Sequence, residues 1–338
     1  MTDYLSYFLP FIATYIVTYA LCIKPFALAK PSNRGLHYKD TATSGGIAIM
    51  VGLLTFHFFS QFPLVILISL FLITIIGSLD DKYSLSKIQR FSLQLLLSVL
   101  LIYESTDVHD KSLIYMFFSL IVLVYFINMV NFIDGIDGLV AMQAIFVFIA
   151  IYMLLDVPDF LGMIAVILGF LFFNRPPNAK IFLGSSGSYL IGYLLGTITI
   201  IYGSIIGTLM IILMTTFIVD SLVVIVRRFF QKYFESTRLI AAIKYVTQAH
   251  CTHTYQNMTK EFNSHSKSLL VITLYNYLWC LPVAYLYLKN FTFTTWYELK
   301  DLDGGDPVIF LLYILLAFAP YLIFCITNQL KNSAKQYE

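Results

Sequence analysis

Long apolar runs follow one another along most of this 338-residue chain, and they restrict its possible folds more than any other feature. Hydrophobic residues make up 59% of the chain and charged residues 12%, against about 25% charge in a typical soluble domain. The sequence therefore predicts an all-α, polytopic integral membrane protein, with a single domain over residues 1–338. About eleven transmembrane helices are expected, at residues 4–23, 45–60, 64–79, 91–103, 113–131, 139–155, 160–173, 189–203, 205–226, 268–288 and 307–327.

The distribution of Lys and Arg predicts the orientation of these spans. If the odd-numbered connections and the C-terminal tail lie on one side, that side holds 18 of the 21 Lys and Arg residues, all except Lys111, Lys289 and Lys300. Because cytoplasmic loops carry the excess of positive charge, the N-terminus is predicted outside and the C-terminus in the cytoplasm. The first run is expected to be a retained span rather than a signal peptide. Residues 227–267 then form a long cytoplasmic loop.

The fifth apolar run ends in a polar patch at residues 128–137, NMVNFIDGID. Asn128, Asn131, Asp134 and Asp137 follow one another at intervals of three, so on a helix they drift slowly around one side. Such groups are costly at the end of a membrane span unless they serve a function, which makes the patch a candidate site. The alternative is a polar loop that merely joins two spans.

Two further cytoplasmic segments carry candidate groups. Asp80 and Asp81 end the third run, and neighbouring side chains on a helix point about 100° apart, so the two carboxylates should meet different partners. The alternative to a functional role is that the two acids at the helix end only balance the charges of Lys82 and Lys87. The turn over residues 182–188, FLGSSGS, could bind phosphate through free N–H groups, or could serve close packing together with Gly192 and Gly196.

The ninth run and the loop after it contribute the remaining candidates. Asp220 lies seven residues before Arg227, on the same helix face, and either pairs internally or takes part in the chemistry. Arg227 and Arg228 are expected to end the span, where they suit phosphate groups. His250 and His253 could share a helix face as phosphate contacts or acid–base groups. Between these two pairs, the run FESTRLIAAIKYV could lie along the membrane surface.

Together these motifs resemble one enzyme superfamily, the polyprenyl-phosphate N-acetylhexosamine-1-phosphate transferases of glycosyltransferase family 4. The resemblance rests on the Asp80-Asp81 pair, NxxNFIDGIDGL at 128–139, PPNAKIFLGxxGS at 176–188, and Asp220, Arg227 and Arg228 followed by histidines. It looks closer to the branch that uses UDP-N-acetylglucosamine and undecaprenyl phosphate than to the lipid I translocase. The superfamily starts cell-surface polysaccharides such as O-antigen in lipopolysaccharide biosynthesis, at the cytoplasmic face of the bacterial inner membrane.

The resemblance implies substrates, a metal and roles for particular residues. A sugar-1-phosphate would pass from a UDP-N-acetylhexosamine to undecaprenyl phosphate in the lipid bilayer, with release of UMP and with Mg²⁺ or Mn²⁺ as cofactor; no nucleic acid is expected as a partner. Asp80 or Asp81 would position or deprotonate the acceptor. The remaining implied contacts are nucleotide and metal at Asn128, Asn131, Asp134 and Asp137, the metal also at Asp81, uracil at Phe182, and phosphates at Arg227, Arg228, His250 and His253.

Three positions depart from the superfamily pattern, and each departure removes a charge or a ligand. Ser185 stands where the pattern has a metal-binding Asp, Ala29 where it has another Asp, and Thr252 where it has the middle histidine of HxHH. A serine hydroxyl is a weak ligand for a hard dication that prefers carboxylates. Two hypotheses therefore stay open: an active transferase, and a catalytically impaired relative that binds polyprenyl phosphate or a nucleotide-sugar.

Overall fold

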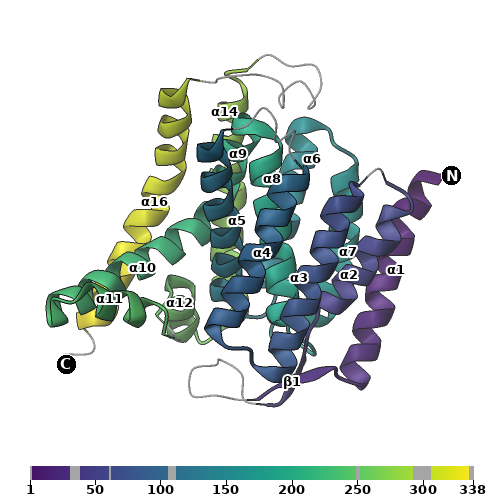
Figure 1. Cartoon of the computed structure of the whole chain (residues 1–338), viewed down its shortest axis with the longest axis horizontal. Helices are drawn as coiled ribbons and strands as arrows, with labels where there is room; N and C mark the ends of the chain where they lie inside the picture. Colours follow the sequence, from purple (N-terminus) through teal and green to yellow (C-terminus); the bar gives the residue numbers. More distant parts are fainter. Residues whose placement is uncertain are drawn as a thin grey trace.

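The computed structural model describes residues 2–30, 39–60, 62–105, 112–248, 252–291 and 306–334. Within these ranges the chain is almost entirely helical, and the helices pack lengthwise into one bundle (Figure 1). The elements are α1 (Thr2–Ile23), β1 (Ala27–Ala29), β2 (Thr41–Thr43), α2 (Gly46–His57), α3 (Leu64–Tyr83), α4 (Lys87–Ser105), α5 (Leu113–Ile133), α6 (Leu139–Leu155), α7 (Asp159–Asn174), α8 (Gly184–Ile201), α9 (Gly203–Leu213), α10 (Thr215–Ser236), α11 (Leu239–Val246), α12 (Thr254–Phe262), α13 (His265–Tyr275), the π-helix η2 (Asn276–Cys280), α14 (Leu281–Leu288) and α16 (Pro307–Ala334).

The all-α prediction is confirmed, because every predicted apolar run lies in helix apart from residues at its ends and one internal break. In the described part of the chain, five helical segments are long and apolar enough to cross a membrane, and α9 with α10 makes a sixth if the bent pair is one span. The five are Tyr4–Ile23, Leu64–Tyr83, Leu113–Ile133, His265–Leu288 and Pro307–Lys331. The total of eleven spans and the orientation stay predictions.

The prediction of one uninterrupted span over 205–226 is wrong, because α9 and α10 meet at a bend of 73° around Met214. The amide of Gln143 on α6 donates to the carbonyl of Leu213 (2.9 Å) and accepts from the side-chain amide of Asn276 in η2 (2.6 Å). Backbone groups released at such a break must find other partners in an apolar surrounding. The break therefore depends on two amides that lie far away in sequence.

Helix α8 forms the centre of the bundle, and all its residues from Ser186 to Ile200 are buried. Gly192 and Gly196 face α5 so closely that a Cβ at Gly192 would lie 2.8 Å from the carbonyl oxygen of Phe126. Small residues allow this approach of two helices inside a membrane protein. The GxxxG pattern at these two positions thus serves packing within the chain.

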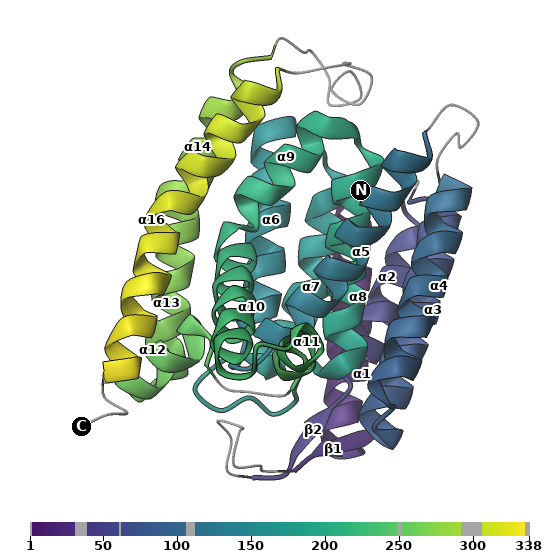
Figure 2. The same ribbon diagram turned by 60° about the vertical axis from the view of Figure 1, so that its left-hand side comes forward.

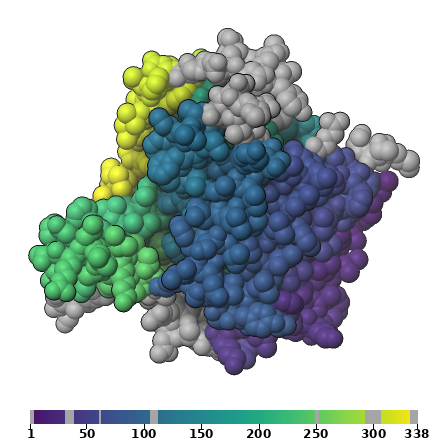
Figure 3. Space-filling model, viewed as in Figure 1, coloured from purple at the N-terminus to yellow at the C-terminus, as the bar shows by residue number. Residues whose placement is uncertain are grey.

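The elements that build the candidate site gather at one end of the bundle, where the β1–β2 hairpin and α12 lie close to the ends of α3 and α5 and the start of α8 (Figures 1 and 2). The start of α1 and the end of α16 lie toward opposite ends of the bundle (Figures 1 and 2). Helices α10 and α11 project from its side (Figure 3). The predicted loop over 227–267 is largely helical, since it holds the last part of α10 and all of α11 and α12.

Candidate functional site

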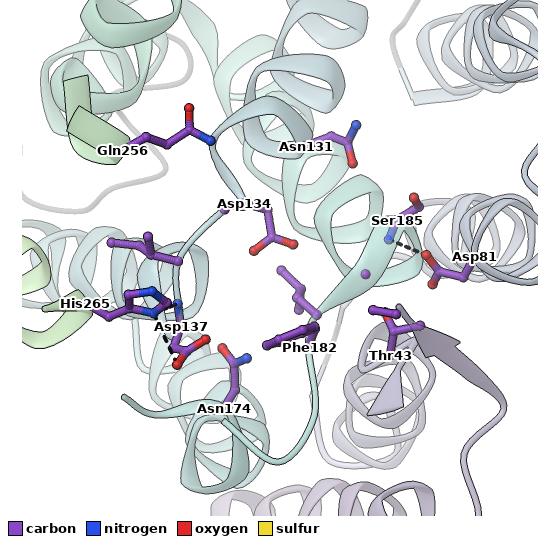
Figure 4. Close-up of a pocket in the computed structure, with 15 residues that line it drawn as sticks. Thr43, Asp81, Asn131, Asp134, Asp137, Asn174, Phe182, Ser185, Gln256 and His265 are labelled. Atoms are coloured by element: carbon purple, nitrogen blue, oxygen red, sulfur yellow. Dashed lines mark hydrogen bonds and ion pairs between the residues drawn. The ribbon is translucent and has the colours of Figure 1, made fainter. Parts of the chain in front are cut away.

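A pocket of about 330 Å³ opens at this end of the bundle, and three carboxylates contribute to its wall (Figure 4). Residues from six helices and the hairpin, or from the turns beside them, form its lining. They are Ala29, Thr43, Asp81, Asn131, Asp134, Gly135, Ile136, Asp137, Asn174, Phe182, Leu183, Gly184, Ser185, Gln256 and His265.

Asp81 reaches the pocket from the last turn of α3, where it caps the N-terminus of α8. Its carboxylate accepts from the backbone N–H groups of Ser185 (2.7 Å) and Ser186 (3.3 Å) and from the hydroxyl of Ser44 (2.8 Å). First-turn N–H groups lack partners within their own helix, and a carboxylate there is also favoured by the helix dipole. The phosphate hypothesis assumed that the N–H groups of the turn over 182–188 are free. Two of them, those of Ser185 and Ser186, instead bind the carboxylate of Asp81.

Glycine is required where α8 begins. Gly184 has a φ of +71°, and a Cβ there would lie 2.6 Å from both Asp81 Oδ2 and the hydroxyl of Thr43. The neighbouring Phe182 is held through its backbone, which donates to Ala42 O (2.8 Å) and accepts from the N–H of Gly45 (3.1 Å). Its ring is thus fixed at the edge of the pocket by pairing with β2 and the turn after it (Figure 4).

The turn from α5 to α6 carries Asp134 and Asp137. The N–H of Gly138, where φ is +77°, donates to the side-chain oxygen of Asn174 (3.0 Å), whose amide donates to Ile181 O (2.8 Å). Tyr255 supports the same turn, because its hydroxyl donates to the carbonyl of Phe132 (3.3 Å). Side chains from α7 and α12 therefore position both acids.

Asp134 has the most unfavourable surroundings for a charge. Burial raises the pKa of Asp134 to about 8, and the charges of Asp81 and Asp137 add to this effect. Among the described residues, no group donates a hydrogen bond to its carboxylate, which points toward the middle of the pocket (Figure 4). A site of this kind favours a proton or a bound cation.

Asp137 is paired with His265, the first residue of α13. The Nδ1 atom of His265 lies 3.2 Å from Asp137 Oδ2 and 3.3 Å from the backbone nitrogen of Asp137. One nitrogen cannot donate to the carboxylate and accept from the N–H in the same state, so the two contacts belong to different states of the imidazole. The pair joins the α5–α6 turn to α13 beside Phe182 and Asn174 (Figure 4).

The structure brings five of the predicted residues into this one pocket and places others elsewhere. Asp81, Asn131, Asp134, Asp137 and Phe182 line it, as do Ala29 and Ser185, the positions of two of the departures. Asp80 instead accepts from Tyr189 (2.9 Å) and pairs with Arg90 (3.3 Å). Asn128 donates to Gln94 (2.9 Å) on α4 and to a carbonyl of its own helix.

The helix that carries Arg227 and Arg228 continues past them, because α10 ends at Ser236. That these two residues end the membrane span stays a prediction. Arg227 contacts the side chain of Gln329 on α16. The buried Arg228 donates to Tyr245 O (2.6 Å), and its guanidinium carbon lies 4.2 Å from the centre of that ring. Lys87 donates to Thr247 O (2.7 Å), so two cations bind carbonyls at the C-terminal end of α11, which suits a helix dipole.

His253 lies outside the pocket lining, buried beside Asp220. Asp220 Oδ1 is 3.2 Å from His253 Nδ1, and the carboxylate also accepts from the backbone N–H groups of Thr254 (2.9 Å) and Tyr255 (3.1 Å). The internal-pairing alternative for Asp220 therefore agrees with the structure, which uses this acid to cap α12. The predicted phosphate contact His250 lies outside the described residues. The carbonyl of Thr252, the position that departs from the histidine motif, accepts from Gln329.

Sequence reasoning missed Asn174, Gln256 and His265, which also line the pocket, as does Thr43. Gln256 accepts from the backbone N–H of His253 (3.2 Å), which orients its amide nitrogen away from that bond. Asn174 is the polar residue that ends an apolar run, and this position was an available signal. No sequence motif links His265 to Asp137, because the two residues are 128 positions apart in the chain.

The donor set fits a hard cation that is held partly by a substrate. In the described chain, no three His, Cys, Asp or Glu side chains converge as a ready-made metal site. However, Mg²⁺ is often bound by one or two carboxylates together with phosphate oxygens and water. Asp134 supplies a carboxylate without hydrogen-bond donors, and the side-chain oxygen of Asn131, which accepts from Ser188 (2.9 Å), lies nearby in the same lining.

Comparison with known proteins supports the resemblance seen in the sequence. Residues 63–203 match glycosyl transferase family 4, and this region contains Asp81, Asn131, Asp134, Asp137 and Phe182. Over 344 aligned residues, the chain is 27% identical to a probable undecaprenyl-phosphate N-acetylglucosaminyl 1-phosphate transferase of Bacillus subtilis (strain 168). The alignment covers 94% of this chain and 90% of that protein. The resemblance to the polyprenyl-phosphate sugar-1-phosphate transferase superfamily is thereby confirmed.

Proposed function

We propose that this membrane protein transfers an N-acetylhexosamine-1-phosphate from a UDP-sugar to undecaprenyl phosphate and releases UMP. One observation carries the proposal: three carboxylates, an aromatic ring and amide side chains from separate helices meet in one pocket at a helix-bundle end. Phosphoryl transfer depends mainly on positioning and on neutralising negative charge, and this arrangement suits both needs. The reaction would begin a cell-surface polysaccharide at the cytoplasmic face of a bacterial inner membrane.

The nucleotide is proposed to bind between Phe182 and the α5–α6 turn. The Phe182 ring would stack on the uracil, and Asp137, held by His265, would contact the nucleoside. Gln256 would face the phosphates or the sugar from the opposite wall, where its amide nitrogen can donate. The structure supports these roles by placing Phe182, Asp137 and His265 together, with Gln256 across the pocket (Figure 4).

Asp134, Asn131 and Asp81 are proposed to hold the cation and the diphosphate. A bound Mg²⁺ would neutralise the negative charge that gathers on the phosphate oxygens during transfer. Asp134 has the strongest need for a positive partner, since its neighbours Asp81 and Asp137 disfavour its charged form. Asp81 already accepts three hydrogen bonds, which would fix the direction of its carboxylate in the site.

In the transfer itself, an oxygen of the acceptor phosphate attacks the β-phosphorus of the UDP-sugar. The new phosphorus–oxygen bond joins the sugar phosphate to the polyprenyl phosphate, while the bond to UMP breaks and UMP leaves. Of the predicted pair, Asp81 lines the pocket and would act there, while Asp80 is engaged by Arg90 and Tyr189. Asp80 therefore would support α3, α4 and α8 rather than contact the acceptor.

The second candidate is a catalytically impaired relative that binds the same molecules. Ser185 lines the pocket with a neutral hydroxyl, and its N–H holds Asp81 at 2.7 Å. Both observations reduce the number of carboxylate oxygens that are available to a cation. Under this hypothesis the pocket binds a nucleotide-sugar or polyprenyl phosphate without transfer.

One assay separates the candidates. Purified protein in lipid nanodiscs receives UDP-N-acetylglucosamine, undecaprenyl phosphate and Mg²⁺, and UMP is measured. We expect UMP from the wild type, loss of more than about a hundredfold in Asp81→Asn and Asp134→Asn, and little change in the control Asp159→Asn, which lies outside the lining. UMP release by Ser185→Asp but none by the wild type would favour the impaired relative. Thermal unfolding of each variant shows whether a loss reflects misfolding.

A further inference from the structure

A second hollow is lined by residues of α2 and α3. These two helices are neighbours in the bundle (Figure 1). The hollow measures about 290 Å³, and we call it the α2–α3 groove. Its walls repeat at intervals of three and four residues, as expected for facing helix sides. They are Ile47, Met50, Val51 and Leu54 on α2, Phe71, Thr74, Ile75, Ser78 and Leu79 on α3, and Phe26 just before β1.

The groove offers only hydrocarbon to a ligand, although two hydroxyl residues belong to its wall. Thr74 donates its hydroxyl to Leu70 O (2.7 Å), and Ser78 donates to Thr74 O (2.8 Å). Both hydroxyls are therefore satisfied within α3. An occupant of the α2–α3 groove must be apolar where it contacts the wall, as an acyl chain is.

A positive charge stands at one end of the groove. The Lys82 ammonium lies 5.0 Å from the ring centre of Phe26, which closes the groove, and 5.6 Å from that of Tyr83. Lys82 follows two acids, but Asp80 pairs with Arg90 and Asp81 caps α8. In the part of the chain that the structure describes, no carboxylate pairs with Lys82, which leaves an exposed ammonium next to an apolar channel.

We propose that the α2–α3 groove binds one acyl chain of an anionic phospholipid, whose phosphate contacts Lys82. This inference is independent of the transferase reaction. The lipid differs from the acceptor because Lys82 and Asp81, neighbours on α3, point about 100° apart, so a phosphate at Lys82 lies on a different side of α3 from Asp81. The α2–α3 groove and the pocket also share no lining residue.

Such a lipid would stabilise the elements that hold the site. It would join α2, the segment before β1 and the C-terminal end of α3, where Asp81 directly precedes Lys82. Ser44, which donates to Asp81, lies between β2 and α2. An anionic lipid in the groove should therefore raise the thermal stability of the protein.

The test is photolabelling in nanodiscs. Phosphatidylglycerol and phosphatidylcholine with the same acyl chain, each carrying a diazirine in mid-chain, are compared by mass spectrometry of the peptides over 47–54 and 71–79. We expect phosphatidylglycerol to label these peptides about fivefold more, the factor for one lysine at an anionic lipid surface. Lys82→Gln should remove that preference, and Ile75→Trp, which fills the groove, should lower labelling by both lipids.

Lys289→Gln is the matched control, because Lys289 also lies over an aromatic ring (Tyr285, 4.7 Å) but belongs to the end of α14. It should leave labelling unchanged. Equal labelling by the two lipids, or labelling that neither variant alters, would overturn the proposal. Displacement of the probe by undecaprenyl phosphate at lower mole fraction than by phosphatidylglycerol would assign the groove to the acceptor and also overturn it. Unfolding scans in phosphatidylcholine nanodiscs check that both variants fold.

Discussion

At the scale of residues, three acids of one pocket differ because their immediate neighbours differ. Asp81 accepts hydrogen bonds from a helix N-terminus, Asp137 lies beside His265, and Asp134 has two other acids near it without a donor among the described residues. The same kind of carboxyl group thus caps a helix, contacts an imidazole, or carries a charge that its surroundings disfavour. Sequence spacing alone gives all three the same appearance.

The pKa of Asp134 predicts a pH-dependent stability. Because burial and two acids raise this pKa from 3.8 to about 8, the folded protein keeps a proton that the unfolded chain releases. The contribution of this group to stability is complete at low pH and is lost as the pH rises through about 8. We expect the melting temperature of protein without divalent cations to fall between about pH 4 and about pH 8 and then to level off.

Asp134→Asn should remove much of this pH dependence, since an amide does not titrate. Mg²⁺ competes with the proton, so its stabilising effect should be larger at about pH 9 than at about pH 6 in the wild type and small in the variant. Differential scanning fluorimetry at several pH values measures both effects. A wild-type stability that rises over this range would contradict the assignment.

At the scale of elements, the site depends on how closely α3 and α8 approach. Gly77 on α3 faces the first turn of α8, and a Cβ there would lie 2.4 Å from Ser186 Cα. This contact is what allows Asp81, one turn later, to reach the N–H groups of Ser185 and Ser186. Gly77 on α3 and Gly184 on α8 are thus needed for the geometry of the site.

Gly77→Ala should therefore weaken both the packing and the cap. We expect a loss of about 1–3 kcal/mol in the free energy of unfolding, as for overpacked positions, and a fall in UMP release. Leu72→Ala is the control, because Leu72 is exposed on the same helix. Denaturant unfolding in detergent measures the difference. An unchanged stability in Gly77→Ala would mean that α3 and α8 can separate without cost.

The bend between α9 and α10 gives a second prediction at this scale. Gln143→Leu leaves the amide of Asn276 and the carbonyl of Leu213 without their partner, which should cost about 1–3 kcal/mol. In the double variant Gln143→Leu, Asn276→Leu, the two losses should not add, because they break one network. Unfolding of all four proteins gives the coupling. Strict additivity would show that the two amides stabilise the bend independently.

At the scale of the whole molecule, the charge distribution predicts the orientation in the membrane. Reporter fusions should place residues after Lys331 in the cytoplasm and the N-terminus outside, as an odd number of crossings requires. The start of α1 and the end of α16 lie toward opposite ends of the bundle, which agrees with this expectation (Figure 1). Protease or alkaline phosphatase reporters at both termini measure it, and two termini on one side would refute an odd number.

The sequence by itself determined which segments are helices, and it identified five residues of the pocket. Apolar runs form helices because the chain must bury its backbone polar groups, and this requirement is local. Asp81, Asn131, Asp134, Asp137 and Phe182 could be found because polar groups at the ends of membrane spans are costly without a use. The resemblance to the family motifs indicates the same residues.

Only the tertiary structure decided which partners these residues have. Asp80 and Asp81 are adjacent in sequence, yet one pairs with Arg90 and the other caps α8, because their side chains point to different neighbouring helices. His265 joins the site through a contact with a residue 128 positions away in the chain. Arg228 lies outside the site, because it binds the carbonyl of Tyr245 in α11. Spacing along one helix reports the face of that helix, whereas the identity of the facing helix depends on packing of the whole chain.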